Sequence, residues 1–257
     1  MGELSGQAAI VTGAAGGIGR AVTLRPAREG ADVLAVDLRA AEVEATAAAA
    51  EGFSGRVIAH AADVTKPEEV RGYVDVAVEA FGRVELFHNN AGVVGPHTSI
   101  VETALEEWDL SVAVNLNGVF YGLKYVLPAI KKAGGGAVVV TGSVLSLKGA
   151  VNRAEYVATK HGALGLARTA AAESAADGIV VNCICPGPIE TPMMELSERL
   201  VNPADPSWER ERLLSGIPAG RYGHAEEIAE LVAFLLSRRV PYLNGAVVSV
   251  DGGLFAV

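Results

Sequence analysis

The sequence predicts a single α/β domain in which a doubly wound parallel sheet of seven strands carries helices on both faces. Three observations lead to this fold class. Short β-branched runs alternate with longer segments rich in Ala, Glu and Leu along nearly the whole chain. The runs are continuously apolar, as are strands of a parallel sheet that is buried on both faces. The 257 residues suit one large domain, and no repeat, linker or break in composition divides them.

The predicted strands and helices alternate in the way that right-handed β-α-β crossovers require. We expect strands at residues 8–11, 33–37, 56–60, 86–89, 137–141, 179–185 and 246–250. We expect helices at residues 18–29, 41–51, 67–81, 105–132, 156–176 and 225–237. The single domain accordingly spans residues 1–257.

Two stretches depart from this regular alternation. Pro26 falls inside the first predicted helix, where its ring and its missing N–H should kink the helix or end it early. Residues 187–222 form a long, polar and Pro-rich stretch between a strand and a helix. A connection of this length is typical of a lid or a binding loop, and we expect short helices within it.

Composition and charge exclude several classes of protein. Half of the residues are hydrophobic, and 30 Asp and Glu outnumber 21 Lys and Arg, for a net charge of −9. This composition excludes a disordered chain, a fibre and a small secreted scaffold. The acidic balance argues against nucleic acid or an anionic membrane as the main partner. The amino terminus lacks the features of a signal peptide and no apolar stretch is long enough to span a bilayer, so we expect a cytoplasmic protein.

The potential metal ligands and thiols are few. The five histidines show no paired metal-ligand spacing, so we expect no metal. Cys183 and Cys185 lie two residues apart in an apolar run. We expect them to be buried residues that point to opposite faces of a strand and form no disulfide.

A glycine-rich turn at residues 12–19 (TGAAGGIG) joins the first predicted strand to the first predicted helix. Glycines let a pyrophosphate approach the main-chain amides, and the helix amino terminus supplies partial positive charge. Such a turn alone can also be a plain tight turn. The residues that we expect to bind phosphate are Thr12, Gly13, Gly17, Ile18 and Gly19.

Asp37 turns this loop into a candidate dinucleotide site. It ends the second predicted strand 18 residues after Gly19 and is followed by Leu38. An acidic side chain at this position accepts hydrogen bonds from both ribose hydroxyls of NAD and repels the 2′-phosphate of NADP. Arg39 is the first basic residue after Asp37, and it lies two positions further on. We therefore expect NAD, with NADP as the alternative.

Tyr156 and Lys160 lie four residues apart, on one face of a predicted helix. Such a pair also occurs by chance, but its chemistry suits hydride transfer. A phenol is a poor base at neutral pH, whereas an ammonium at roughly 4–5 Å stabilises a phenolate by about 3–4 kcal/mol at an effective dielectric of about 20. Tyr156 can then take a hydroxyl proton as hydride leaves. Ser143, at the carboxyl end of the fifth strand, can hydrogen-bond the substrate oxygen beside it.

Asn115 lies inside the predicted helix at residues 105–132, where asparagine is a poor helix former. It is either a solvated or capping residue, or a buried one that distorts the turn and holds a water molecule.

These residues together resemble those of the short-chain dehydrogenase/reductase family, over essentially the whole chain. The family has a Rossmann fold. Further motifs that carry the resemblance are Asp63-Val64, NNAG at residues 89–92, Pro186-Gly187, GRYG at 220–223, EEIA at 226–229 and VDGG at 250–253. Two departures, Thr159 for the commoner Ser and Ala225 for the commoner Pro, do not touch the chemistry.

The resemblance implies an NAD-dependent oxidoreductase that acts on CH–OH groups as a homotetramer or a homodimer. It implies a catalytic tetrad of Asn115, Ser143, Tyr156 and Lys160, in which Asn115 holds a water that relays the proton and Lys160, with Tyr156, also meets the nicotinamide ribose. Asn90 has the alternative role of holding neighbouring strands together. The other implied cofactor contacts are Asp63 and Val64 at the adenine, Asn90, Ala91 and Gly92 at the adenosine side, and Pro186, Gly187, Ile189 and Thr191 at the nicotinamide.

Residues 190–193 and 221–236 look most like those of family members that act on small or cyclic secondary alcohols and ketones. We expect a small-molecule substrate in an apolar pocket, with Ser143 and Tyr156 at its reacting oxygen. Each wall candidate can equally be ordinary core or lid packing. The wall candidates are Val94, His97, Val144, Leu145, Met193, Met194 and Trp208.

Three other functions compete with this interpretation. The first is a ketoreductase of the same family that acts on 3-oxoacyl thioesters. The second is a nucleotide-sugar epimerase or dehydratase, which usually has an added substrate domain for which 257 residues leave no space. The third is a non-catalytic nucleotide-binding protein on the same fold, which the intact tetrad disfavours.

Overall fold

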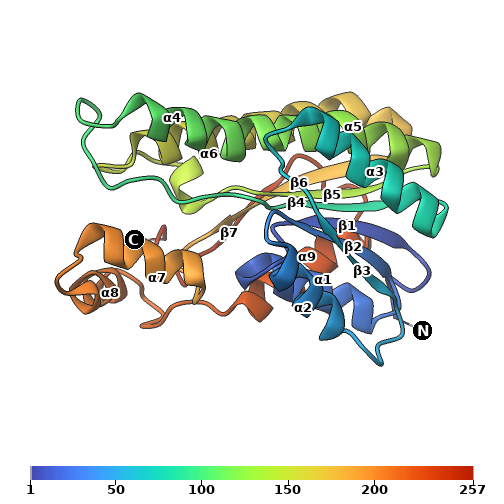
Figure 1. Ribbon diagram of the computed structural model, residues 1–257, viewed down its shortest axis with the longest axis horizontal. Helices are drawn as coiled ribbons and strands as arrows, with labels where there is room; N and C mark the ends of the chain where they lie inside the picture. The colour runs from blue at the N-terminus through green and yellow to red at the C-terminus, as the bar shows by residue number, and fades with distance from the viewer. Residues whose placement is uncertain (1, 257) are drawn as a thin grey trace.

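The structure is a computed structural model that describes residues 2–256, so Met1 and Val257, the two ends of the predicted domain, lie outside it. Within the described chain, seven strands form one parallel sheet in the order β3-β2-β1-β4-β5-β6-β7 (Figure 1). The predicted doubly wound sheet is therefore confirmed. The strands are β1 (Ala8–Thr12), β2 (Asp32–Asp37), β3 (Val57–Ala61), β4 (Leu86–Asn89), β5 (Gly136–Thr141), β6 (Ile179–Pro186) and β7 (Val247–Val250).

Helices cover both faces of the sheet (Figure 1). On one side lie α3 (Pro67–Phe81), α4 (Leu105–Val112), α5 (Gly118–Lys132) and α6 (Ala154–Ser174). On the other lie α1 (Gly17–Arg28), α2 (Ala40–Ala48) and α9 (Ala225–Leu236). Within residues 2–256, no helix combines the length and the apolar composition that crossing a membrane would take.

Two apolar clusters, one on each face of the sheet, explain why the strands read as continuous apolar runs. Along β5, Val138 and Val140 pack into the cluster beneath α3, α5 and α6, whereas Ala137 and Val139 pack into the cluster beneath α1 and α9. All four side chains are fully buried. Because successive side chains of a strand point to opposite faces, a sheet covered on both sides leaves no polar face.

Cys183 and Cys185 correct one prediction. Both are free and buried, but they lie on the same face of β6, in the cluster beneath α6, while Ile184 between them packs into the opposite cluster. The reason is the two-residue period of a strand, which places residues i and i+2 on one side. The contact with Cys185, together with burial, raises the pKa of the Cys183 thiol.

Pro26 does not end α1 where it stands. The helix continues through Pro26 to Arg28, one residue short of the predicted end. The Pro26 carbonyl accepts the amides of Glu29 and Ala31 at 3.0 and 3.1 Å, so the last turn keeps its hydrogen bonds on the carbonyl side. Proline is tolerated here because its missing N–H removes a single bond close to the helix end.

The helix predicted at residues 105–132 is interrupted at its middle. A π-helical turn, Ala113–Asn117, separates α4 from α5, and Asn115 lies fully buried at its centre. A single widened turn of this kind is frequent at functional sites. Asn115 is therefore buried in a distorted turn, for a reason given by the hydrogen bonds described below. That it also holds a water molecule stays a prediction.

The sheet topology decides where a ligand can bind. β1 is flanked by β2 on one side and β4 on the other, so the chain leaves the sheet in opposite directions and opens a crevice at the carboxyl ends of the strands. The connection after β6 carries two short helices, α7 (Pro192–Val201) and α8 (Pro206–Ser215), as predicted for residues 187–222. Figure 1 shows α7 and α8 at one end of the molecule, apart from both helical layers.

Candidate active site

A hydrogen-bonded network ties together the carboxyl ends of β1, β4 and β5. The Thr12 hydroxyl oxygen accepts the main-chain amides of Asn90 and Ala91 at 2.9 and 3.1 Å. The Asn90 amide group donates to the Thr12 carbonyl at 3.0 Å, and its oxygen accepts the Thr141 hydroxyl at 3.1 Å. The side chain of Asn90 therefore holds neighbouring strands together, which was one of its two predicted roles.

His88 completes this network from within the sheet. Its Nε2 lies 2.9 Å from the Thr141 hydroxyl oxygen, whose own proton goes to Asn90, so Nε2 is the donor. Burial lowers the pKa of the His88 imidazole to about 3, so the ring is neutral at neutral pH. The imidazole thus serves as a fixed donor that orients Thr141.

The glycine-rich turn is shaped by two close approaches. Gly13 has a left-handed backbone (φ +69°), and a Cβ on it would lie 2.8 Å from the Asn90 side chain. A Cβ on Gly19 would lie 2.0 Å from the Gly13 carbonyl oxygen, so any side chain there would force the turn apart. Ile18 follows Gly17 in the first turn of α1 and packs against the cluster on that face. The amino terminus of α1 therefore lies directly after this turn, and within residues 2–256 no side chain caps it.

Asp37 stands at the carboxyl end of β2 and points at this turn. One carboxylate oxygen accepts the Ala15 amide at 3.0 Å, and the other accepts the Arg39 amide at 3.0 Å. The Arg39 side chain makes an ion pair with Asp37 at 3.4 Å. Leu38, between them, is 69% exposed and leaves an apolar surface beside the carboxylate. Because each carboxylate oxygen has two acceptor positions, Asp37 keeps capacity for a ligand.

Asp63 and Val64 line the next stretch of the crevice, after β3. One oxygen of Asp63 accepts both the main-chain amide and the hydroxyl of Thr65, at 2.9 and 2.7 Å. The Asp63 amide in turn donates to Glu69 at 2.8 Å. Val64 lies against Gly118 at the start of α5, where a Cβ would approach it to 3.1 Å.

Asn115 bonds to a single residue of the loop after β4. Its side-chain oxygen accepts the Val93 amide at 2.8 Å, and its side-chain nitrogen donates to the Val93 carbonyl at 3.0 Å. This reciprocal pair, with a longer contact of 3.5 Å from the same nitrogen to the Thr159 hydroxyl oxygen, explains why the helix widens at this residue. A Cβ on Gly92 would lie 3.1 Å from Asn115 and 3.6 Å from the Lys160 ammonium, so glycine is needed for the loop to lie this close.

Lys160 is only 4% exposed, and its ammonium donates to the Thr141 carbonyl at 2.9 Å. Within residues 2–256 it forms no ion pair. The same ammonium lies 5.7 Å from the centre of the half-buried Tyr156 ring, one turn earlier on α6. The charge of Lys160 is therefore directed at the phenol and at the end of β5.

Ser143 follows β5 and caps a short helical turn, Val144–Ser146. Its hydroxyl oxygen accepts the Leu145 amide at 3.1 Å. Because that bond uses an acceptor position, the hydroxyl proton is left to donate to a ligand. The arrangement places a free donor at the carboxyl edge of the sheet.

Pro186, Gly187 and Ile189 lead from β6 into the predicted lid (residues 187–222, called the lid below), and Thr191 caps α7 by accepting the Met194 amide at 3.2 Å. A Cβ on Gly17 would lie 3.0 Å from the Thr191 side chain. The start of α7 therefore meets the glycine-rich turn across the crevice, and the structure brings these predicted cofactor residues together.

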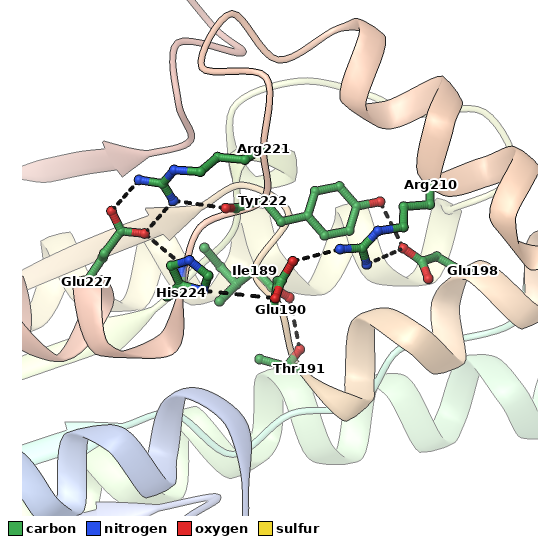
Figure 2. Close-up of polar contacts among 9 residues, drawn as sticks. All are labelled: Ile189, Glu190, Thr191, Glu198, Arg210, Arg221, Tyr222, His224 and Glu227. Carbon is green, nitrogen blue, oxygen red and sulfur yellow. Dashed lines mark hydrogen bonds and ion pairs between the residues drawn. The ribbon is translucent and has the colours of Figure 1, made fainter.

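A cluster of four side chains, Tyr222, Glu198, Arg210 and Glu190, fastens the lid to the sheet edge (Figure 2). The Tyr222 hydroxyl donates to Glu198 of α7 at 2.9 Å, and Arg210 of α8 lies 4.5 Å above the Tyr222 ring. Arg210 also pairs with Glu198 at 3.7 Å and with Glu190 at 2.6 Å. We call this cluster the lid latch. Burial, and then the bond to Glu198, raise the pKa of the Tyr222 phenol, so it remains a donor.

Next to the lid latch, Arg221 and Glu227 form a two-pronged ion pair at 2.7 and 2.8 Å (Figure 2). This pair, with the His224 amide, lowers the pKa of Glu227 to about 2. It fixes the segment that carries Tyr222 at the start of α9.

Comparisons with known proteins agree with this geometry. A family model described as enoyl-(acyl carrier protein) reductase matches residues 13–255. Levodione reductase of Leifsonia aquatica is 41% identical over 95% of this chain and 92% of its own. The chain belongs to the short-chain dehydrogenase/reductase family. Members of this family are oxidoreductases that act on alcohol and ketone groups with a nicotinamide cofactor.

Other members of the family are nearly as similar. The 3-oxoacyl-(acyl carrier protein) reductase of Thermotoga maritima is 38% identical over 98% of this chain and 99% of its own. Cyclohexanol dehydrogenase of an Acinetobacter species is 37% identical over 97% of this chain and 95% of its own. The crystal structure of levodione reductase matches with a TM-score of 0.96 at 40% identity, covering 98% of this chain and 99% of that one. The crystal structure of NAD⁺-bound xylitol dehydrogenase matches with a TM-score of 0.94 at 31% identity, covering 97% of this chain and 99% of that one.

The predicted wall of the substrate pocket is less uniform than the catalytic residues. Val94 and Leu145 are half-buried at the strand ends, and Val144 is buried beneath them. On the lid, Met194 is half-buried, whereas Met193 and Trp208 are 41% and 50% exposed. His97 is half-buried in the loop after β4.

Sequence reasoning missed two features of this family member's site. One is the lid latch, and the other is Arg153, which stands at the N-cap position of α6 and donates to Ser197 of the lid at 2.6 Å. The signal for Arg153 was its position three residues before Tyr156, hence on the same helix face. No group of three or more His, Cys, Asp or Glu side chains that could hold a metal occurs within residues 2–256.

The lid latch yields a prediction. Tyr222→Phe removes the hydroxyl bond to Glu198, whose carboxylate is only 6% exposed. We expect the free energy of unfolding to fall by about 1–3 kcal/mol, because a buried carboxylate loses a donor. Chemical denaturation measures this. The control is Tyr121→Phe, because the Tyr121 hydroxyl makes no hydrogen bond to residues 2–256. Equal stability of the Tyr222→Phe variant and the wild type would contradict the role of the latch.

Proposed function

We propose that the protein transfers a hydride between NAD(H) and a small, cyclic or apolar secondary alcohol or its ketone. The observation that carries the proposal is the position of the Lys160 ammonium, which donates to the Thr141 carbonyl at 2.9 Å and lies 5.7 Å from the Tyr156 ring. The names of two relatives, levodione reductase and cyclohexanol dehydrogenase, support the substrate class.

In this proposal, each of the four tetrad residues has its own role in the transfer of one proton. When bound, the nicotinamide supplies or accepts the hydride at its C4 carbon. In alcohol oxidation, Tyr156 takes the proton of the substrate hydroxyl while the carbinol C–H bond breaks and a C=O bond forms; in reduction it returns that proton. Lys160 stabilises the phenolate of Tyr156, and it keeps two of its three donors for the nicotinamide ribose and solvent.

Ser143 and Asn115 have supporting roles in this proposal. The free proton of the Ser143 hydroxyl donates to the substrate oxygen and stabilises charge that develops on it. Asn115 uses both side-chain groups on Val93, so its side chain fixes the loop after β4. We propose that the main chain of this widened turn holds the relay water that the family resemblance implies.

The crevice residues fit a dinucleotide along its length. The glycine-rich turn and the amino terminus of α1 would hold the pyrophosphate, and Asp37 the adenosine ribose. Asp63 and Val64 would meet the adenine, with Leu38 beside it, and Asn90, Ala91 and Gly92 the adenosine side. Pro186, Gly187, Ile189 and Thr191 would enclose the nicotinamide. We propose NAD rather than NADP because the Asp37 carboxylate, which keeps one acceptor position for a ribose hydroxyl, would repel a 2′-phosphate.

Assembly and the lid are also proposed. Large apolar side chains on the outer surface of α4 and α5 are exposed in the single chain, and covering them supports a homotetramer or a homodimer. These side chains are Leu105, Trp108, Leu110 and Phe120. Residues 187–222, with α7 and α8, form the lid over the substrate. A 3-oxoacyl thioester is the second candidate substrate, because the Thermotoga maritima reductase is 38% identical.

The mechanism predicts a large loss of turnover in Tyr156→Phe. We expect kcat for cyclohexanone reduction to fall by about 100- to 10,000-fold, because the proton donor is removed. The dissociation constant of NADH, followed by its fluorescence, should change little. Tyr242→Phe is the control, because Tyr242 is fully exposed and far from the crevice in sequence. Retention of full turnover by Tyr156→Phe would overturn the mechanism.

The cofactor preference is tested at Asp37. In the wild type, kcat/KM should be higher with NAD⁺ than with NADP⁺. In Asp37→Ser this preference should fall by at least about 10-fold, because the ribose hydroxyls lose their acceptor and the 2′-phosphate loses a repelling charge. Glu42→Ser, an exposed carboxylate on α2, is the matched control. A wild type that prefers NADP⁺ would refute the role of Asp37.

A further inference from the structure

Arg153 is the charged side chain nearest in sequence to the catalytic tyrosine on its amino-terminal side, apart from Glu155. It is the capping residue of α6, three residues before Tyr156, and it is half-buried. The residue before it, Asn152, has a left-handed backbone (φ +60°), which is rare outside glycine. This turn brings the chain sharply into α6 and fixes the direction in which Arg153 leaves the main chain.

The guanidinium of Arg153 lies between three segments that surround the predicted substrate pocket. From α6 it reaches across to Ser197 of the lid helix α7, at 2.6 Å. Its charge also acts on His97 in the loop after β4, where burial and then Arg153 lower the pKa of the imidazole. The group therefore stands at the meeting point of α6, the lid and the loop after β4, beside the reacting tyrosine.

Most of the hydrogen-bond donors of the Arg153 side chain have no acceptor within residues 2–256. A guanidinium has five N–H donors, and within residues 2–256 the bond to Ser197 is its one hydrogen bond. It forms no ion pair in that range. Two carboxylates act on it from a greater distance. Glu155 is fully buried with both oxygens unpartnered, and Glu209 of α8 is committed to Arg212 at 2.6 and 2.7 Å.

A half-buried cation with unused donors costs stability unless another group accepts them. Burial lowers the pKa of the Arg153 guanidinium, which nevertheless stays charged because arginine is not deprotonated in proteins. Packing alone does not account for such a residue, because an apolar side chain would fill the same place at less cost. The fork of donors matches an oxygen acceptor, and a carboxylate best of all.

We propose that Arg153 binds a second oxygen acceptor of the substrate, a carboxylate or a carbonyl, while Ser143 and Tyr156 engage the reacting oxygen. The inference rests on the proposed function and narrows its substrate class to bifunctional ketones and alcohols. In this proposal, the predicted apolar pocket has one further polar contact besides those at the reacting oxygen. Because Arg153 also donates to Ser197, the position of its guanidinium depends on the position of α7. The lid therefore takes part in recognising the substrate.

The test uses three ketones on one ring: 4-oxocyclohexane-1-carboxylate, its methyl ester and 4-ethylcyclohexanone. At the position opposite the ketone, the acid carries a charged hydrogen-bond acceptor, the ester carries a neutral one, and the ethyl compound carries none. We expect the wild type to reduce at least one of the first two with a kcat/KM about 10-fold or more above that of the third, as one charged hydrogen bond predicts. If the gain in kcat/KM is larger for the acid, the group that Arg153 binds is a carboxylate. If the acid and the ester show equal gains, that group is a carbonyl.

Arg153→Met should lower kcat/KM for the preferred ketone by about 10- to 100-fold, chiefly through KM, because the lost bond holds the substrate before and during reaction alike. For 4-ethylcyclohexanone the change should stay within about 3-fold. Arg153→Lys should restore part of the loss for the acid. Arg199→Met, an exposed arginine on α7, is the matched control. If Arg153→Met fails to fold, Arg153→Gln, which can still bond Ser197, replaces it.

An equal loss on all three ketones, or no loss on any, would overturn the role of Arg153 while leaving the proposed function intact. A wild type that favours 4-ethylcyclohexanone would do the same. A wild type that turns over no ketone and no secondary alcohol would instead contradict the proposed function, and this role with it.

Discussion

The candidate site depends on Thr141, which offers its two polar groups in two directions at the end of β5. Its carbonyl accepts the buried Lys160 ammonium, and its hydroxyl donates to Asn90 while accepting from His88. Asn90 in turn bonds Thr12 next to the glycine-rich turn. One strand end therefore sets the distance between the glycine-rich turn and Lys160. Hydride transfer needs such a fixed distance, because a small misplacement of reacting groups costs much of the rate.

Two parts of the molecule make up the candidate site. One part consists of strand ends and helix termini around the buried sheet. The other is the predicted lid, residues 187–222, which is held through two adjacent residues of α7. Ser197 accepts a hydrogen bond from Arg153 of α6, and Glu198 accepts one from Tyr222, just before α9. In the function that we propose, the first part carries out the hydride chemistry and the second selects the substrate, as function grafted on a common fold allows.

The sequence was a good guide wherever a signal is local. Apolar runs located the strands, and the glycine pattern located the turn between β1 and α1. The four-residue spacing of Tyr156 and Lys160 located the helix face that both occupy. The prediction for Cys183 and Cys185 was wrong because residues two apart in a strand lie on the same face of the sheet. The length of the lid and its short helices followed from its proline-rich composition.

What could not be predicted depends on contacts between distant residues. The widened turn at Asn115 is set by Val93, 22 residues earlier, and the lid latch joins Tyr222 to Glu198 across 24 residues. In the sequence, Arg153 is an ordinary residue near the start of a helix. Its contact with Ser197, 44 residues away, can be recognised only in the fold. Such pairs need the fold before they can be recognised, because side-chain direction follows from the backbone around them.

In the function that we propose, this site transfers a hydride directly between the nicotinamide and a carbinol carbon. The most direct measurement is mass spectrometry of the alcohol formed from cyclohexanone and NADH deuterated at one face of C4 of the nicotinamide. We expect one face-labelled form of the cofactor to deliver a single deuterium to the carbinol carbon, with none lost to water. An alcohol without deuterium from either labelled form, or deuterium released to the solvent, would contradict it.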